Sequence, residues 1–433
     1  MNNKVVKNAT WIIVCKAIEA ILHLVITMIT TRYLGPANYG VINYAASVMA
    51  FAVPFMHLGV RSILINEFVN APKRKGEILG TALFLNFVSS FLCVLGVLAF
   101  AYVANYNETE TIIVCLLYSI SLIFQAAEVL KYWFQEQLLS KYVSVSMLLA
   151  YVVMSVYQVL ILMAGKDIYW FAISETLKHL AIALLLVFQY WRHGGERLSV
   201  SFPLAGRLLS RGKHYILANL MLTVFSQTDK IMLKPLCGDE ETGYYAAAVT
   251  CASVANFVFL AITDSARPMI FKSQLKSEAE FEKNMVLLYA VVGWLSLLQC
   301  VGFTVFAKLA IGILYGAAYE RAVPMLQITV WYTAMAHMGL VRDIWILSQE
   351  KQSYMWKMNI FGAVANVALN LVLIPPFGGV GAAVASLISQ FIATIGMCFI
   401  FKDLRHVNRL MLRGMDLRVL IEGARQLLSR KVQ

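Results

Sequence analysis

The chain has 433 residues, of which 60% are hydrophobic and only 14% charged. A soluble domain is usually about 45–50% apolar and about 25% charged, so this composition excludes an ordinary soluble protein and predicts a polytopic membrane protein. The formal net charge is +12. In a membrane protein such an excess of Lys and Arg first indicates which loops face the cytoplasm, and it does not by itself predict nucleic-acid binding.

The first apolar stretch carries Lys16, Glu19 and His23, and no small-residue cleavage site follows it. We therefore expect a retained spanning helix rather than a cleaved signal peptide. The 7 cysteines are scattered, nearly all within apolar runs, and none forms a CxxC motif. They are expected to be small buried hydrophobes, with no metal site and no disulfide framework.

A spanning helix needs roughly 20 mostly apolar residues. The sequence predicts twelve of them, at 9–31, 39–65, 78–104, 111–134, 143–165, 168–191, 214–236, 243–270, 284–306, 321–346, 357–376 and 379–401. The predicted organisation is an N-terminal lobe of six helices (1–191), a basic cytoplasmic linker (192–213), a C-terminal lobe of six helices (214–401) and a basic tail (402–433). No large soluble domain fits between the helices.

The loops between these helices divide sharply in charge. With the N-terminus inside, 24 Lys and Arg residues fall in cytoplasmic segments and five in outer ones. Cytoplasmic loops collect positive charge, so both termini are expected to be cytoplasmic. In the tail, Leu412, Met415, Val419 and Leu420 recur near helical spacing among arginines, which favours an amphipathic helix on the anionic inner leaflet; a solvated tail is the alternative.

The two predicted lobes share an internal pattern. Gly35 and Gly40 are separated by five residues after the first helix, and Gly238 and Gly243 are separated by five after the seventh. Each second glycine opens an Ala-rich helix, and a short hairpin joins the last two helices of each lobe. Repeated halves are typical of transporters that rock two lobes around a central site.

Charged residues inside the predicted helices form four pairs spaced i,i+3, which can neutralise each other on one helix face: Lys16/Glu19, Glu128/Lys131, Glu175/Lys178 and Asp264/Arg267. Asp229 and Lys230 are adjacent and point about 100° apart, so each must find a partner on another helix, in water or in a ligand. His57 and His179 are interpreted as packing histidines, whereas His23 extends the Lys16–Glu19 stripe.

Four segments carry a family resemblance: TRYLGPANYG (31–40), DKIMLKPLCGDEETGYYAAA (229–248), GILYGAAYERAVPMLQI (312–328) and IPPFGGVGAAVASLISQ (374–390). In this order they resemble the polysaccharide transporter family, the bacterial flippases of O-antigen and other lipid-linked oligosaccharides. Multidrug and toxin exporters and lipid II flippases belong to the same superfamily. The resemblance implies an all-α polytopic membrane protein with twelve transmembrane helices in two six-helix lobes around a central cavity.

The resemblance also implies the transported molecule, an oligosaccharide on undecaprenyl pyrophosphate that moves from the inner to the outer leaflet of the bacterial inner membrane. A pyrophosphate would be attracted by cations in the cavity. The candidates for binding it are Lys16, Arg61, Lys230 and Arg267. Candidates for ion coupling or for polar cavity groups are Glu19, His23, Asp229, Glu175 and Lys178.

The chain has no P-loop, so a proton or sodium gradient is expected to drive transport, with no cofactor and no catalytic residue. Expected partners are the lipid-linked oligosaccharide, the membrane and other assembly proteins such as a polymerase or a chain-length regulator. Nucleic acid is not expected. Two alternatives remain: a drug or small-cation antiporter on the same fold, and a membrane glycosyltransferase or polymerase. The short, mostly apolar outer loops disfavour the enzyme.

Overall fold

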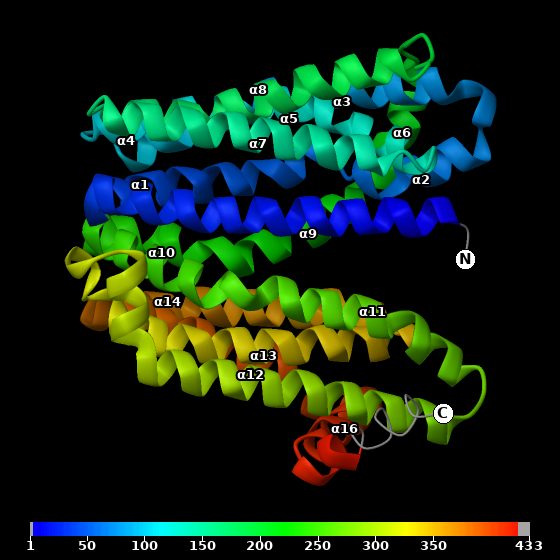
Figure 1. Cartoon of the computed structure of the whole chain (residues 1–433), viewed down its shortest axis with the longest axis vertical. Helices are drawn as coiled ribbons and strands as arrows, with labels where there is room; N and C mark the ends of the chain where they lie inside the picture. Colours follow the sequence, from blue (N-terminus) through cyan, green and yellow to red (C-terminus); the bar gives the residue numbers. More distant parts are fainter. Residues whose placement is uncertain (1–2, 423–433) are drawn as a thin grey trace. The chain divides into compact units, whose positions relative to one another are not determined.

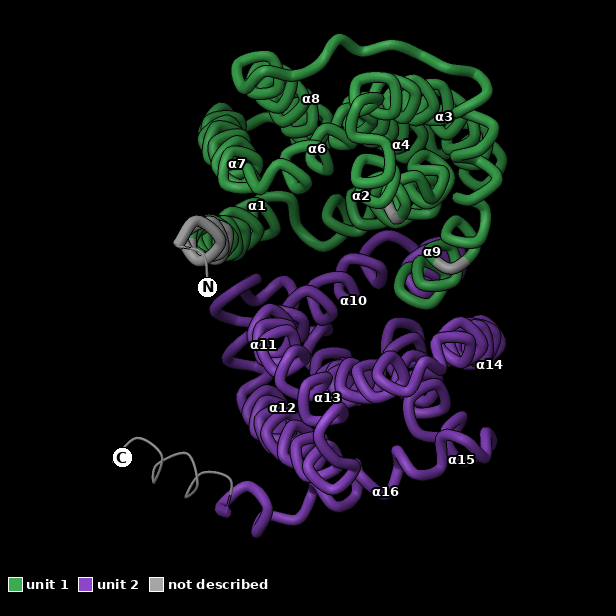
Figure 2. Tube along the Cα trace, turned by 90° about the vertical axis from the view of Figure 1, so that its right-hand side faces the viewer, with its two compact units in different colours: residues 1–227 green, residues 228–433 purple. Residues whose placement is uncertain are grey.

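The computed structural model describes residues 3–422, and within that range the chain is helical with short turns and no strand. Figure 1 shows the helices coloured along the sequence. The chain forms two compact units, residues 1–227 and 228–433, which Figure 2 draws in different colours. The predicted all-α polytopic fold is confirmed. The predicted lobe boundaries and central cavity stay predictions.

Unit 1 consists of helices joined by short turns. In chain order these are α1 (Asn3–His57), α2 (Val60–Asn70), η1 (Pro72–Arg74), α3 (Lys75–Ala104), α4 (Thr109–Ser119), α5 (Ser121–Gln125), η2 (Ala126–Val129), α6 (Leu130–Glu136), α7 (Ser140–Met163) and α8 (Ile168–Arg192). The last helix, α9 (Phe202–Cys237), begins in unit 1 and ends in unit 2. It starts before the predicted boundary at 214, so half of the predicted linker is helical.

Unit 2 repeats the helical architecture. Its elements are α10 (Asp239–Ala252), η3 (Ser253–Ala255), α11 (Asn256–Gln274), α12 (Glu278–Leu314), η4 (Ala317–Tyr319), α13 (Ala322–Ser348), α14 (Ser353–Phe391), the π-turn η5 (Ile392–Gly396), α15 (Met397–Ile400), η6 (Lys402–Leu404) and α16 (Arg405–Gly414). As in unit 1, a glycine interrupts one of the long helices.

Eight helical stretches in the described part of the chain are long and apolar enough to cross a membrane. Two of them, in α1 and α14, each contain two predicted spans joined at a non-helical glycine, Gly35 (φ 73°) and Gly378 (φ 56°). The two remaining predicted spans correspond to α9 and α13, which carry more polar residues. These elements together account for the twelve predicted helices.

The predicted helix 39–65 is broken where α1 ends and α2 begins. Pro54 removes one backbone donor, and Leu58 and Gly59 take positive φ angles of 50° and 66°. The backbone of Gly212 in α9 fills the space that a Cβ on Gly59 would need, and a Cβ on Gly212 would meet the carbonyl oxygen of Leu58. The break therefore allows two backbones to touch, and an ion pair between Arg211 and Glu67 lies beside it.

The two units have separate hydrophobic cores. In unit 1 the core joins α2, α3, α6 and α8 to the start of α9, through Leu204 and Leu208. In unit 2 the core includes Val407, Leu410 and Met411 of α16, which packs against α12. Each core buries apolar faces of the helices of its own unit.

Part of the predicted apolar face of the tail is exposed. Leu412 is 69% exposed and Met415 is at the surface, while Val407, Leu410 and Met411 are buried. The carboxylate of Glu282 on α12 lies 2.7 Å from His406 and 3.2 Å from Arg413. These two contacts hold α16 against α12. The predicted placement of the tail on the inner leaflet stays a prediction, and residues 423–433 lie outside the described range.

Candidate functional site

The interior of unit 1 contains a chain of five charged or titratable side chains from two neighbouring segments. Glu175, Lys178 and His179 share one face of α8 because they are spaced i, i+3 and i+4. Lys178 Nζ donates to both Glu175 oxygens at 2.7 Å. This pair confirms one of the predicted local ion pairs.

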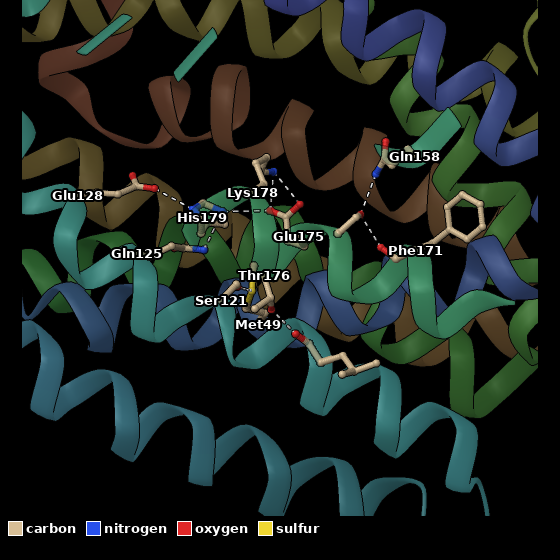
Figure 3. A network of polar contacts seen from close by, with 12 residues as sticks. Met49, Ser121, Gln125, Glu128, Gln158, Phe171, Glu175, Thr176, Lys178 and His179 are labelled. Atoms are coloured by element: carbon tan, nitrogen blue, oxygen red, sulfur yellow. Dashed lines mark hydrogen bonds and ion pairs between the residues drawn. The ribbon is translucent and has the colours of Figure 1, made fainter. Parts of the chain in front are cut away.

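Glu128 supplies the second half of the chain from the tight turn η2 within the fourth predicted helix. Side chains at i and i+3 eclipse each other in such a turn. Lys131 Nζ accordingly lies 2.5 Å from Glu128 Oε2. The other oxygen of Glu128 lies 2.8 Å from His179 Nδ1. Figure 3 shows Glu128 and Glu175 on either side of His179, with Lys178 next to Glu175.

His179 is therefore more than the packing histidine that the sequence suggested. Its Nε2 lies 3.1 Å from Glu175 Oε1, so the ring links the two predicted ion pairs into one network. The side chains of this network are 13–23% exposed. The i,i+4 spacing of Glu175 and His179 could have predicted their contact from the sequence. The contact with Glu128 could not be predicted, because Glu128 lies on a different helix.

The stripe on α1 is only partly paired. His23 Nδ1 lies 2.7 Å from the hydroxyl of Tyr151 on α7. Lys16 is exposed and Glu19 half-buried, and among the described side chains the predicted Lys16–Glu19 ion pair is not formed, so that prediction is wrong. Arg61, at the start of α2, places its guanidinium 5.9 Å from the ring centre of Tyr132.

Unit 2 contains a buried carboxylate surrounded by neutral donors. Asp229 on α9 is 5% exposed. Its Oδ1 accepts from Asn366 at 2.9 Å and from Asn370 at 2.6 Å, and its Oδ2 accepts from the Tyr245 hydroxyl at 2.5 Å and from Ser386. The expectation that Asp229 finds its partners on other helices is confirmed, since α10 and α14 supply all four.

The donor set around Asp229 decides what the site can hold. No Lys, Arg or His forms an ion pair with Asp229 within 4 Å among the described residues, although the neighbouring Lys230 attracts it electrostatically. Two amide nitrogens and two hydroxyls donate to the carboxylate, and Asn370 Oδ1 has no hydrogen-bond partner. A buried carboxylate of this kind can take up a proton. Within the described range, no group of three or more His, Cys, Asp or Glu side chains is arranged so that it could hold a metal ion.

Sequence reasoning missed Asn366, Asn370 and Ser386. The two asparagines are spaced i,i+4 and interrupt the predicted helix 357–376, which is otherwise strongly apolar. Both side chains are fully buried. An asparagine pair on one face of a membrane helix is costly without a partner and could have been recognised as one half of a polar site.

The other candidates of unit 2 form no hydrogen bond to Asp229 among the described residues. Lys230 is half-buried and does not share a helix face with Asp229, but its positive charge is close enough to attract the carboxylate. Asp264 and Arg267 form their predicted pair at 3.3 Å, with both side chains largely exposed. Arg342 is buried and donates to Asp343 and to the Ala393 carbonyl in the π-turn η5.

Comparisons with known proteins show the family and the fold to which the chain is related. The chain is 21% identical over 411 residues to "Capsular polysaccharide biosynthesis protein CapF" of Staphylococcus aureus, covering 92% of this chain and 99% of the relative. It is 22% identical over 411 residues to "Putative O-antigen transporter" of Escherichia coli K12, covering 90% and 94%.

Among solved structures, lipid II flippase MurJ in an inward closed conformation matches with a TM-score of 0.71 and 13% identity, covering 95% of this chain and 91% of that one. An inward-facing multidrug resistance MATE family transporter matches with a TM-score of 0.69 and 12% identity, covering 91% and 99%. These likenesses show a shared fold. A family model described as "Polysaccharide biosynthesis protein" matches residues 5–274, more than half of the chain, and the chain therefore belongs to that family.

Proposed function

We propose that this chain is a flippase that moves an oligosaccharide linked to undecaprenyl pyrophosphate from the cytoplasmic to the periplasmic leaflet. The family match and the names of the two relatives support a role in surface polysaccharide assembly. The proposal places the protein in the bacterial inner membrane with both termini cytoplasmic, in agreement with the distribution of Lys and Arg. The name of the Escherichia coli relative supports an O-antigen type of repeat unit.

The observation that carries the proposal is the pair of polar sites, one inside each unit. A charged side chain at the centre of a bilayer costs about 2.5–3.5 kcal/mol on insertion scales, and such residues usually serve transport. Unit 1 keeps a network with two lysines in its interior, and unit 2 keeps a buried carboxylate that accepts from four neutral donors. A structural role alone would be served by apolar residues at lower cost.

Two groups of residues have separate roles in this proposal. The cations Lys16, Arg61, Lys230 and Arg267 attract the diphosphate of the lipid carrier during alternating access. Asp229 couples transport to an ion gradient as a buried carboxylate that can take up a proton and whose four hydrogen-bond donors are all neutral. Glu19, His23, Glu175 and Lys178 line the route as polar groups. A chain-length regulator and a polymerase would act on the delivered unit.

Complementation tests the proposal. In a strain that lacks its own oligosaccharide flippase, the wild-type gene is expected to restore surface polysaccharide. Lys16→Ala, Arg61→Ala and Lys230→Ala are each expected to reduce it at unchanged protein levels, because each removes a cation that attracts the diphosphate. Lys276→Ala is the matched control, since Lys276 is exposed and pairs with Glu280. Full polysaccharide in all three variants would contradict the assignment of these cations.

A drug or small-cation antiporter is the second candidate, favoured by the carboxylate site and by the fold shared with a multidrug transporter. The same strains separate the two functions. An antiporter would raise resistance to cationic drugs and leave the polysaccharide unrestored.

A further inference from the structure

The starting point is the position of His179 between two carboxylates from different segments of unit 1. Its Nδ1 lies 2.8 Å from Glu128 Oε1, and its Nε2 lies 3.1 Å from Glu175 Oε1 (Figure 3). The side-chain amide of Gln125 also lies 3.2 Å from Nε2, and by turning over it can present its oxygen to a protonated Nε2. Both ring nitrogens therefore face a carboxylate oxygen at hydrogen-bond distance.

A neutral imidazole has one N–H donor and one lone pair. A lone pair directed at a carboxylate oxygen repels it, so both contacts are favourable only when the ring carries two protons. We infer that Glu128, His179 and Glu175 hold one exchangeable proton, carried on the His179 ring, and that this proton promotes binding of a diphosphate to Lys131 and Lys178. The diphosphate half of the inference rests on the proposed function.

The lysines at the two ends of the network make it responsive to anions. Lys131 pairs with Glu128 and Lys178 pairs with Glu175, and their side chains are 21% and 23% exposed. Without the proton, two lysines balance two carboxylates and the network is neutral. With the proton, His179 satisfies both carboxylates, and the network has an excess positive charge that an anion can neutralise.

Proton and diphosphate therefore bind cooperatively. The interior of a membrane protein screens charge poorly, so an excess charge there is unfavourable until it is paired. A bound diphosphate stabilises the protonated ring, and by reciprocity the protonated ring strengthens diphosphate binding. Affinity is expected to rise as the pH falls, and binding is expected to take up a proton from solution.

Other titratable or charged groups face this network from the helices packed on α8 and η2. They are His23, His57, Arg61, Tyr118, Tyr132 and Tyr151. Within the described residues none of them bonds to the His179 ring, whose contacts are Glu128, Glu175 and Gln125. A free carboxylic acid titrates about two pH units below histidine, so the shared proton belongs on the ring.

The first test needs no ligand. Nuclear magnetic resonance of protein with ¹⁵N-labelled histidine, in lipid bilayers near neutral pH, reports whether each ring carries one or two protons. Comparison with His179→Gln assigns the His179 signal. Two protonated nitrogens are expected. A neutral ring with one N–H would overturn the inference.

The second test uses farnesyl diphosphate in isothermal titrations in two buffers of different ionisation enthalpy. At a pH above that at which the ligand-free ring loses its second proton, the wild-type protein is expected to take up as much as one proton per ligand, with affinity rising up to about tenfold per unit fall in pH. His179→Gln is expected to abolish both effects. His337→Gln is the matched control, because that buried ring contacts only the neutral side chains Ser296 and Asn256 and stacks on Phe259.

The outcomes separate the inference from the proposed function. Unchanged proton uptake in His179→Gln would contradict the proton assignment. If that variant does not fold, Glu175→Gln, which keeps the side-chain shape, is expected to abolish the uptake instead. Inorganic pyrophosphate is expected to cause the same uptake, because the lysines recognise the diphosphate rather than the lipid. A doubly protonated His179 without binding of either probe would support the proton site and overturn both the diphosphate assignment and the proposed function.

Discussion

Asp229→Asn is expected to reduce transport about 100-fold while the protein remains folded. The substitution removes the negative charge and places an NH₂ group where Oδ1 or Oδ2 now accepts hydrogen bonds from Tyr245, Ser386, Asn366 and Asn370. The variant lacks the proposed coupling group, and a rise of about 3 kcal/mol in the transport barrier corresponds to this factor. Transport is measured as the rate at which surface polysaccharide appears after the gene is induced in the strain that lacks its own flippase.

The control for this variant is Asp264→Asn in the same unit. The Asp264 side chain is 65% exposed and pairs locally with Arg267, so its replacement should change transport little. Gel filtration and thermal unfolding in detergent show whether each variant is folded. Wild-type transport by folded Asp229→Asn protein would exclude the carboxylate as the coupling group.

Gly212→Ala is expected to destabilise the protein by about 3 kcal/mol, the upper range for overpacking a tight contact. The new Cβ would meet the carbonyl oxygen of Leu58, and neither backbone can move without disturbing the break between α1 and α2. Thermal unfolding of purified protein in detergent measures the loss.

Gly206→Ala is the matched control, because it lies on the same helix with open space around it. That substitution should be neutral, or stabilising by about 0.5–1 kcal/mol through the helix propensity of alanine. Equal unfolding temperatures for the two variants would mean that the Gly59–Gly212 contact does not constrain the fold.

The glycine pattern shared by the two halves of the sequence predicted where the helices turn. Gly35 and Gly238, the first glycines of the repeated motif, both take positive φ, 73° and 86°. The hairpin glycines Gly165 and Gly378 do the same, at 64° and 56°. Each of these four glycines therefore takes a backbone conformation that a residue with a Cβ would adopt only with strain. This requirement for glycine is why the turns can be located from the sequence.

Helix positions were predictable for a related reason. A long apolar run has few alternatives to a membrane helix, since its backbone must satisfy its own hydrogen bonds. The break at Leu58 and Gly59 was not predicted, because it depends on the distant Gly212. The early start of α9 was missed because Leu204 and Leu208 find their apolar partners in unit 1 rather than in lipid.

The candidate sites show the same limit. Spacing along one helix predicted the pairs Glu128–Lys131 and Glu175–Lys178, and it indicated that Asp229 and Lys230 do not share a helix face. It gave no information on which side chains meet across helices. The link through His179 and the asparagines around Asp229 therefore came only from the structure.

Reconstituted translocation tests the central claim most directly. Purified protein in liposomes would be supplied with a short oligosaccharide on a polyprenyl diphosphate in one leaflet, and its arrival in the other leaflet would be followed by an impermeant sugar-modifying enzyme. A flippase predicts protein-dependent translocation that requires an ion gradient and is lost in Asp229→Asn. Translocation no faster than in protein-free liposomes under every gradient, with export of a cationic dye instead, would contradict the account.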